Sequence, residues 1–208
     1  MTTEATTEVG LRERKKARTR LSIQHQALRL FREQGYDATT VEQIAAAADI
    51  SPSTFFRYFP TKEDVVLADE YDPLAIAAIR NQPLDVPPIE AIRRAMHVTF
   101  DELAASDLAD FDERVRLIFL VPELRAAASD QLFMQSLDEV AAMLAERLGV
   151  SADDLTVRTL AGSLLGVALS SMYRWAADPA EPLIDVLDKA LRHLNAAYPL
   201  VGTAHSLG

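Results

Sequence analysis

Apolar residues recur every three or four positions along almost the whole of this 208-residue chain. That spacing gathers them on one face of an α-helix, whereas a half-buried strand needs apolar and polar residues in alternation. No alternating run bounded by Asn-Gly or Asp-Gly turns occurs in the sequence. The pattern therefore predicts an all-α fold, long enough for one sizeable core or for two small helical domains that share an interface.

Capping residues, glycines and prolines divide this pattern into helices. Gly35 should stop the first helix after Gln34, and Pro73 should kink or end the fourth. The first four helices are expected to start at Arg14, at Thr39 or Thr40, at Ser51 and at Thr61. Later helices are expected near residues 88–105, 109–120, 122–148, 153–177 and 183–197.

The formal net charge of −10 is distributed unevenly. Residues 1–62 carry ten basic and seven acidic side chains and so a net charge of +3, whereas residues 63–208 carry −13. Phosphate groups attract the first part and repel the second. This division predicts a DNA-facing head over residues 1–66 and a separate body over residues 67–208.

Residues 39–59 meet the requirements of a helix-turn-helix, in which two short helices cross steeply through a tight turn. Six apolar side chains would form its small shared core: Val41, Ile44, Ala45, Ile50, Phe55 and Phe59. Four short or positively charged side chains would remain outside, within reach of phosphates or base edges: Ser51, Ser53, Thr54 and Arg57. The alternative is an ordinary pair of antiparallel helices.

A basic segment precedes this unit, with six cations among the nine residues 12–20. It includes four side chains that we expect to contact DNA: Arg14, Lys15, Lys16 and Arg18. The segment could lie along the phosphate backbone or enter the minor groove. The alternative is a solvated, disordered tail, but the neighbouring helix-turn-helix favours contact with DNA.

At this point the sequence resembles the tetracycline-repressor-like (TetR) family of regulators. The resemblance rests on the stretch LFREQGYDATTV at residues 30–41, on Ile44 and Ala45, and on SPSTFFRYFPTKE at residues 51–63. It covers roughly residues 20–65. It implies an N-terminal three-helix head that reads an operator in double-stranded DNA and a C-terminal helical body that binds a small molecule and dimerises.

The resemblance also assigns roles by motif position. It implies that Thr40 contacts a phosphate at the start of the second helix and that Lys62 holds a phosphate from the start of the fourth. The third helix should present seven residues to DNA: Ser51, Pro52, Ser53, Thr54, Phe56, Arg57 and Tyr58.

Three positions depart from the family pattern. Asp49 stands where the turn usually has a glycine, so it must adopt the turn conformation at some energetic cost and brings a negative charge near DNA. Phe56 replaces a common tyrosine and has no hydroxyl to offer a phosphate. Tyr58 stands where a histidine is frequent and could supply a hydroxyl instead.

The form FFRYFP at residues 55–60 resembles a subset of the family that binds acyl-CoA-like ligands. We therefore expect a repressor that a small apolar or acyl-type effector releases from its operator. A homodimer is expected because one short helix buries too little surface for specificity, and two would read half-sites about 34–36 Å apart.

Aromatic and methionine side chains recur at helical spacing in the body, a pattern that either a plain core or a ligand cavity would produce. The family resemblance favours a cavity, for which we expect eight lining residues: Phe100, Phe119, Phe133, Leu137, Leu165, Leu169, Met172 and Tyr173. Arg116, Arg125 and Arg174 could bind an anionic head group of the ligand, but a surface or salt-bridge role is the better explanation of each.

A stripe of small residues runs along the helix expected near 153–177. Gly162, Gly166 and Ser170 are spaced by four, so one face of this helix has almost no side-chain bulk. Another helix or a ligand could approach closely there. In the TetR family the last two long helices usually form the dimer interface, which this stripe would suit.

The sequence gives no support to catalysis or to a cofactor. It has no cysteine, which excludes thiol nucleophiles, zinc ribbons and iron–sulfur clusters. Among its four histidines only His97 has a carboxylate four residues away, Asp101, too little to predict a metal site. The N-terminus lacks the apolar stretch of a signal peptide, and we expect a soluble, cytoplasmic protein without membrane contact.

The basic segment gives the first testable prediction. Replacing Arg14, Lys15, Lys16 and Arg18 with alanine should weaken DNA binding broadly and flatten its salt dependence, by about one unit of the log–log slope for each phosphate that is no longer neutralised. Fluorescence anisotropy with promoter DNA from upstream of the protein's own gene measures both. Unchanged affinity and slope would instead support an all-α ligand-binding or enzymatic protein whose N-terminal hairpin is only structural.

Overall fold

The computed structural model describes residues 3–68, 72–129 and 131–197, with the side chains of 3–14, 72–74, 129 and 131–133 left out. The described residues form eleven helices and no strand, in agreement with the all-α prediction. Four helices make up the head and its connection to the body: α1 Thr3–Gln34, α2 Val41–Ala47, α3 Pro52–Tyr58 and α4 Lys62–Leu67. Seven make up the body: α5 Asp72–Arg80, α6 Pro88–Asp101, α7 Ala105–Leu120, α8 Pro122–Ser129, α9 Gln131–Leu148, α10 Leu155–Ala177 and α11 Leu183–Ala197.

Side-chain caps start the short helices of the head where the sequence predicts. Thr40, not Thr39, is the N-cap of α2, and its hydroxyl accepts a hydrogen bond from the backbone N–H of Gln43. Ser51 caps α3 with Pro52 in the first turn, and Thr61 caps α4. Each cap satisfies a backbone donor that the helix itself leaves unpaired, which lets helices of six or seven residues form.

The first helix is much longer than predicted, because α1 begins at Thr3 and not near Arg14. The sequence prediction was wrong because it started the helix where the apolar face starts. Residues 3–13 contain no proline, and most of them tolerate or favour helix. An apolar face is needed for packing, but a helix can continue into solvent beyond it.

The boundary predicted at Pro73 was also wrong. Pro73 neither kinks nor ends the helix that starts at Thr61, because α4 ends at Leu67 and Pro73 lies in the first turn of α5. Proline is tolerated there because its missing N–H would have had no helical partner. The single helix expected over residues 122–148 covers α8 and α9; residue 130 between them lies outside the described residues, so the continuity of this helix stays a prediction.

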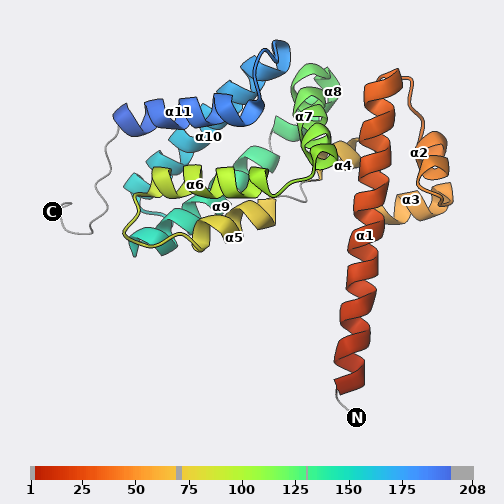
Figure 1. The fold of residues 1–208 in the computed structure, drawn as a ribbon, viewed down its shortest axis with the longest axis horizontal. Helices are drawn as coiled ribbons and strands as arrows, with labels where there is room; N and C mark the ends of the chain where they lie inside the picture. The colour runs from red at the N-terminus through yellow and green to blue at the C-terminus, as the bar shows by residue number, and fades with distance from the viewer. Residues whose placement is uncertain (1–2, 69–71, 130, 198–208) are drawn as a thin grey trace.

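Figure 1 shows α1 standing at one side of the molecule, with α2 and α3 on its outer flank and the body on its inner flank. The head packs around four fully buried side chains, Ile23, Ile44, Phe55 and Phe59. All six apolar residues predicted for the helix-turn-helix core belong to this cluster or pack against it. The same cluster includes Leu117 of α7 and Leu124 of α8, so the core of the head continues into the body.

Two buried polar side chains bind the C-terminal end of α4 from opposite sides. Gln24 of α1 donates to the carbonyl oxygens of Val65 and Ala68, each at 2.9 Å, and Arg114 of α7 donates to that of Val66 at 3.0 Å. Gln24 and Arg114 are only 5% and 6% exposed. The last carbonyls of a helix have no partner within it, so these bonds satisfy groups whose burial would otherwise be costly.

The body contains two further clusters of buried apolar side chains. The larger one lies among α6, α9, α10 and α11, and the smaller one surrounds Trp175 near the end of α10. Helix α10 contacts α7, α9 and α11 and therefore lies at the centre of the body. The body is thus a helical bundle, and its α7 and α8 face the head (Figure 1).

Candidate DNA-binding surface and effector site

A left-handed residue makes the turn between α2 and α3. The N–H of Ile50 donates to the carbonyl of Ala45 at 2.9 Å and that of Asp49 to Ala46 at 3.2 Å, the two bonds of a Schellman motif. Asp49 has φ 55°, among the described residues the only positive φ outside glycine. This confirms that Asp49 must adopt the turn conformation that glycine adopts without strain.

Short hydroxyl side chains gather at the beginning of α3. The hydroxyl oxygen of Ser51 lies 3.0 Å from that of Ser53 and 2.9 Å from that of Thr54, and it accepts the backbone N–H of Thr54. Ser51, Pro52 and Ser53 are exposed, whereas Thr54 is half-buried. Three of these predicted DNA contacts therefore lie together on the outside of the head, and Thr54 lies beside them.

The aromatic residues of α3 divide between the core and the surface. Phe55 and Phe59 are fully buried, whereas Phe56 is 51% exposed with its ring against the edge of Phe55. Arg57 is exposed and its guanidinium lies 5.4 Å from the centre of the Tyr58 ring. Burial of one face of α3 fixes its orientation, so Phe56 and Arg57 are held outward.

Lys62 lies in a more enclosed position than the family pattern suggests. Its ammonium donates to the carbonyl oxygens of Tyr36 at 2.9 Å and Thr39 at 3.2 Å, and it lies 4.0 Å from the centre of the Tyr36 ring. The Tyr36 hydroxyl donates to Glu63 at 3.0 Å, and burial together with this bond raises the pKa of Tyr36. Lys62 therefore links the start of α4 to the segment that leads into Thr40.

The predicted basic arm is part of a helix. Lys15, Lys16 and Arg18 are exposed on α1, while the side chain of Arg14 lies outside the described residues. The expectation that this segment could enter the minor groove disagrees with the structure. An α-helix with its side chains is about 10–12 Å in diameter, whereas the minor groove of B-DNA is about 6 Å wide. The exposed cations of α1 can still contact the phosphate backbone of DNA.

Sequence reasoning missed one arginine that holds the reading helix. Arg20 of α1 donates to the carbonyl of Tyr58 at 3.1 Å, and its guanidinium lies 4.4 Å from the centre of the Phe59 ring. Its place in the basic run hid this role, because the sequence does not distinguish an arginine that faces α3 from one that faces solvent. Arg20 therefore ties the C-terminal end of α3 to α1.

Seven of the eight residues predicted to line an effector cavity have described side chains, and these are divided between two apolar clusters and the surface. Phe119 and Tyr173 stack edge to face across α7 and α10 with ring centres 6.1 Å apart, and Met172 packs beside them in the Trp175 cluster. Phe100 stacks on Phe111, and Leu137 packs in the larger cluster. Of the remaining three, Leu165 is half-buried, Leu169 is 39% exposed and the side chain of Phe133 lies outside the described residues.

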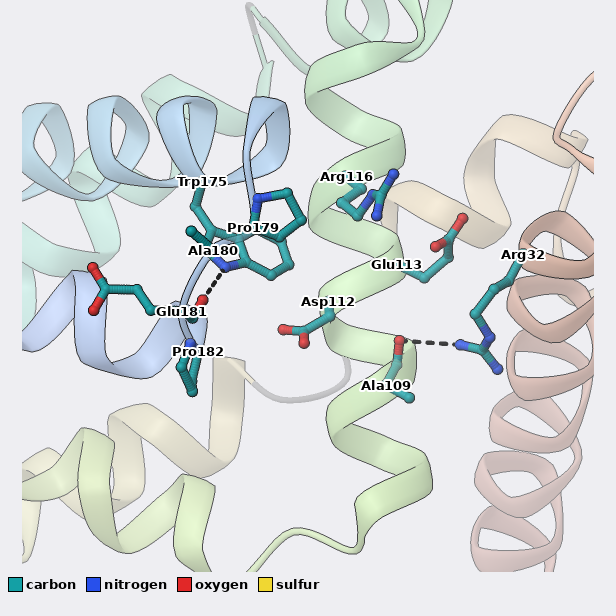
Figure 2. Close-up of a pocket in the computed structure, with 10 residues that line it drawn as sticks. All are labelled: Arg32, Ala109, Asp112, Glu113, Arg116, Trp175, Pro179, Ala180, Glu181 and Pro182. Carbon is teal, nitrogen blue, oxygen red and sulfur yellow. Dashed lines mark hydrogen bonds between the residues drawn. The ribbon is translucent and has the colours of Figure 1, made fainter.

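Three clefts of the structure are lined by other residues. One of 490 Å³ lies between α1, α7 and the segment after α10 (Figure 2). Its polar lining includes Arg32, Asp112, Glu113 and Arg116, and burial raises the pKa values of both carboxyl groups. Arg116 was a sequence candidate for an anionic ligand, but the acidic neighbours make this cleft a poor anion site.

A second cleft, of 420 Å³, lies between α1 and the α6–α7 segment. His25 of α1 and the buried Asp110 of α7 both line it, with Nδ1 and Oδ2 2.5 Å apart. Arg32 of α1 approaches Asp110 to 3.6 Å and donates to the carbonyl of Ala109 at 3.2 Å (Figure 2). Burial raises the pKa of Asp110, although His25 and Arg32 act against this shift.

The small-residue stripe predicted for dimerisation lies open in the single chain. Gly166 and Ser170 are exposed, and a Cβ atom on Gly162 or Gly166 would meet no atom within 4 Å. Among the described residues, α10 is the one helix that is long and apolar enough to span a membrane. Only 28% of its most apolar 18-residue stretch is buried. An apolar face of a central helix is therefore left uncovered, as a partner surface would be.

A short helix with an exposed polar face, held on a helix-turn-helix and joined to a helical body, is the architecture of a DNA-binding transcriptional regulator. Residues 23–68 match the family described as bacterial regulatory proteins, tetR family, and residues 86–199 match the family described as MftR C-terminal domain. The chain belongs to the TetR family of transcriptional regulators. This confirms the resemblance found in the sequence and the expectation that the protein is no enzyme.

Two relatives that are named as transcriptional regulators support this membership over most of the chain. The regulator TcmR of Streptomyces glaucescens is 35% identical over 156 residues, which are 70% of this chain and 67% of TcmR. MftR of Mycobacterium tuberculosis, whose name assigns it to the regulation of mycofactocin biosynthesis, is 31% identical over 91% of this chain and 92% of its own length.

A solved structure of the repressor FadR from Thermus thermophilus, in complex with lauroyl-CoA, is similar in sequence and in fold. It is 30% identical, covers 91% of this chain and 99% of FadR, and has a TM-score of 0.55. A regulator from Syntrophomonas wolfei has a TM-score of 0.64 at 21% identity, which shows the fold alone.

The strained turn gives the second testable prediction. Asp49→Gly should raise the free energy of unfolding by about 0.5–1 kcal/mol, because glycine adopts the left-handed conformation without a Cβ clash. Asp49→Asn is the matched control that removes the charge and keeps a Cβ. Urea denaturation measures the stability, and a fall in stability for Asp49→Gly would contradict the strain.

Proposed function

We propose that this regulator is a repressor that binds its operator as a homodimer and dissociates when an apolar or acyl-type ligand occupies the body. The observation that supports it most is the likeness, at 30% identity over 91% of this chain, to a repressor solved with lauroyl-CoA. The protein works where the operator DNA is, in the cytoplasm.

In this proposal the outer face of α3 enters the major groove. Ser53 and Arg57 are exposed and would reach base edges, and Phe56 would contact apolar parts of the groove. Thr40, at the exposed N-cap of α2, and the cations on α1 would bind phosphates on either side of the reading helix. Asp49 lies beside this surface, and its charge would weaken binding slightly.

Contacts between head and body provide the route for release. Gln24 and Arg114 bind the end of α4, and His25 binds Asp110 of α7. A ligand that shifts α7 would therefore move α1 and α4, and with them the spacing of the two reading helices in a dimer. Release follows only if the ligand binds the non-DNA-binding arrangement more tightly, because equal affinity for both would shift nothing.

The third testable prediction concerns release. Lauroyl-CoA should lower the fluorescence anisotropy of labelled promoter DNA bound to the protein, whereas coenzyme A without the acyl chain should not at the same concentration. The acyl chain supplies the apolar surface that a body pocket would bury. DNA binding that persists at saturating lauroyl-CoA would contradict an acyl-type effector and leave the DNA-binding role intact.

The fourth testable prediction concerns the dimer. Gly166→Arg should give a folded monomer, because its new side chain meets no atom of its own chain but would fill the space for a partner helix. DNA affinity should fall by about 100-fold or more, since one reading helix keeps little specificity. Analytical ultracentrifugation and anisotropy measure the two effects.

Ala127→Arg is the matched control, because Ala127 is exposed on α8 and the substitution adds the same charge away from α10. This variant should stay dimeric. A dimeric Gly166→Arg variant with unchanged DNA affinity would contradict an interface on this face of α10.

A further inference from the structure

Three arginines and a histidine gather on the surface between α6 and α11. Arg93, Arg94 and His97 come from α6 and Arg192 from α11, and together they line a cleft of 480 Å³. The part of the chain that follows residue 62 carries a net charge of −13, so a cationic cluster here runs against the charge of its surroundings.

A buried carboxylate arranges these cations. Asp188 is 6% exposed and accepts from Arg93 at 2.8 Å and from Arg192 at 2.7 Å, and His97 lies 3.2 Å from it. Burial by itself would raise the pKa of Asp188, but the hydrogen bonds from these three side chains hold that pKa below its usual value. Asp188 therefore fixes two guanidinium groups and the imidazole of His97 around one point.

Glu90 and Asp188, the two carboxylates of the cluster, do not pair with all of the N–H groups of the arginines. Glu90 accepts hydrogen bonds from Arg93 and Arg94. Asp188 is contacted by Arg93, Arg192 and His97, so each of the four carboxylate oxygens already has a partner. Arg94 and Arg192 use only their Nε atoms in these bonds, and among the described residues their Nη atoms have no acceptor. Their side chains are 53% and 64% exposed.

The balance of charge and geometry favours an anion with several negative charges. Three guanidinium groups face two carboxylates, which leaves a net positive charge even when His97 is neutral. Guanidinium groups present paired N–H donors that match the oxygens of phosphate, and two of them approach the cleft from different helices. A cleft of 480 Å³ has room for more than a single carboxylate group.

We propose that the cleft between α6 and α11 binds a phosphate-bearing anion of the diphosphate class through Arg94 and Arg192, with Arg93, His97 and Asp188 holding the site in place. The site lies apart from the residues expected to line the effector cavity, and it does not depend on which effector the protein binds. The diphosphate could be a free anion or part of a nucleoside diphosphate.

Isothermal titration calorimetry at constant ionic strength tests the site, with pyrophosphate and ADP as separate probes. The wild-type protein should bind at least one of them with one site per chain. The double variant Arg94→Ala/Arg192→Ala should bind about tenfold more weakly or not at all, because each guanidinium removed takes charge-assisted hydrogen bonds with it.

The double variant Arg80→Ala/Arg158→Ala is the matched control, since both arginines form ion pairs elsewhere on the body. It should bind as the wild type does. Binding of pyrophosphate would identify a free anion, and binding of ADP alone a phosphate-bearing organic ligand. No binding of either probe to the wild type, or equal loss in both double variants, would overturn the proposal. Equal thermal unfolding of the variants confirms that they are folded.

Discussion

The end of α4 is the point on which the arrangement of this regulator depends. Its last carbonyl groups lie between head and body, where Val65 and Val66 are fully buried. Gln24 of α1 and Arg114 of α7 supply the donors, and both are almost fully buried. If either helix moved away, it would leave buried carbonyls without partners, which costs more than breaking a hydrogen bond that water can replace. Head and body are therefore linked by polar bonds as well as by apolar packing.

The other end of α4 faces the DNA-binding unit. Lys62 there contacts the carbonyl groups of Tyr36 and Thr39, next to the cap of α2. A helix of six residues thus has one end bound to the body and the other end bound beside the reading surface. In the proposed release, such a short helix would move as a unit. This is why we place the route of effector release through α4, with the His25–Asp110 contact beside it.

Charge is organised on two scales in this protein. The overall division between a basic head and an acidic body directs the head toward DNA and keeps the body away from phosphates. Within the acidic body, Asp188 gathers two arginines and a histidine and so creates a local exception. Aspartate therefore has two different effects: spread over a surface it repels anions, and buried beneath arginines it fixes the positions of their guanidinium groups.

The sequence by itself determined what depends on neighbours along the chain. The all-α class and the caps at Ser51 and Thr61 follow from residues a few positions apart, which also limited the cap of α2 to Thr39 or Thr40. The turn conformation of Asp49 followed from the resemblance to the family. The extent of α1 was missed, because a helix in solvent needs no apolar face.

Only the tertiary structure decided which distant side chains meet. Arg93 and Asp188 are 95 positions apart, and the orientation of α6 against α11 brings them together. The residues predicted to line the effector cavity illustrate the same point. Helical spacing shows which face of a helix each residue lies on, but not whether those faces surround one cavity. Local patterns fix the elements of this regulator, and the packing of those elements fixes its sites.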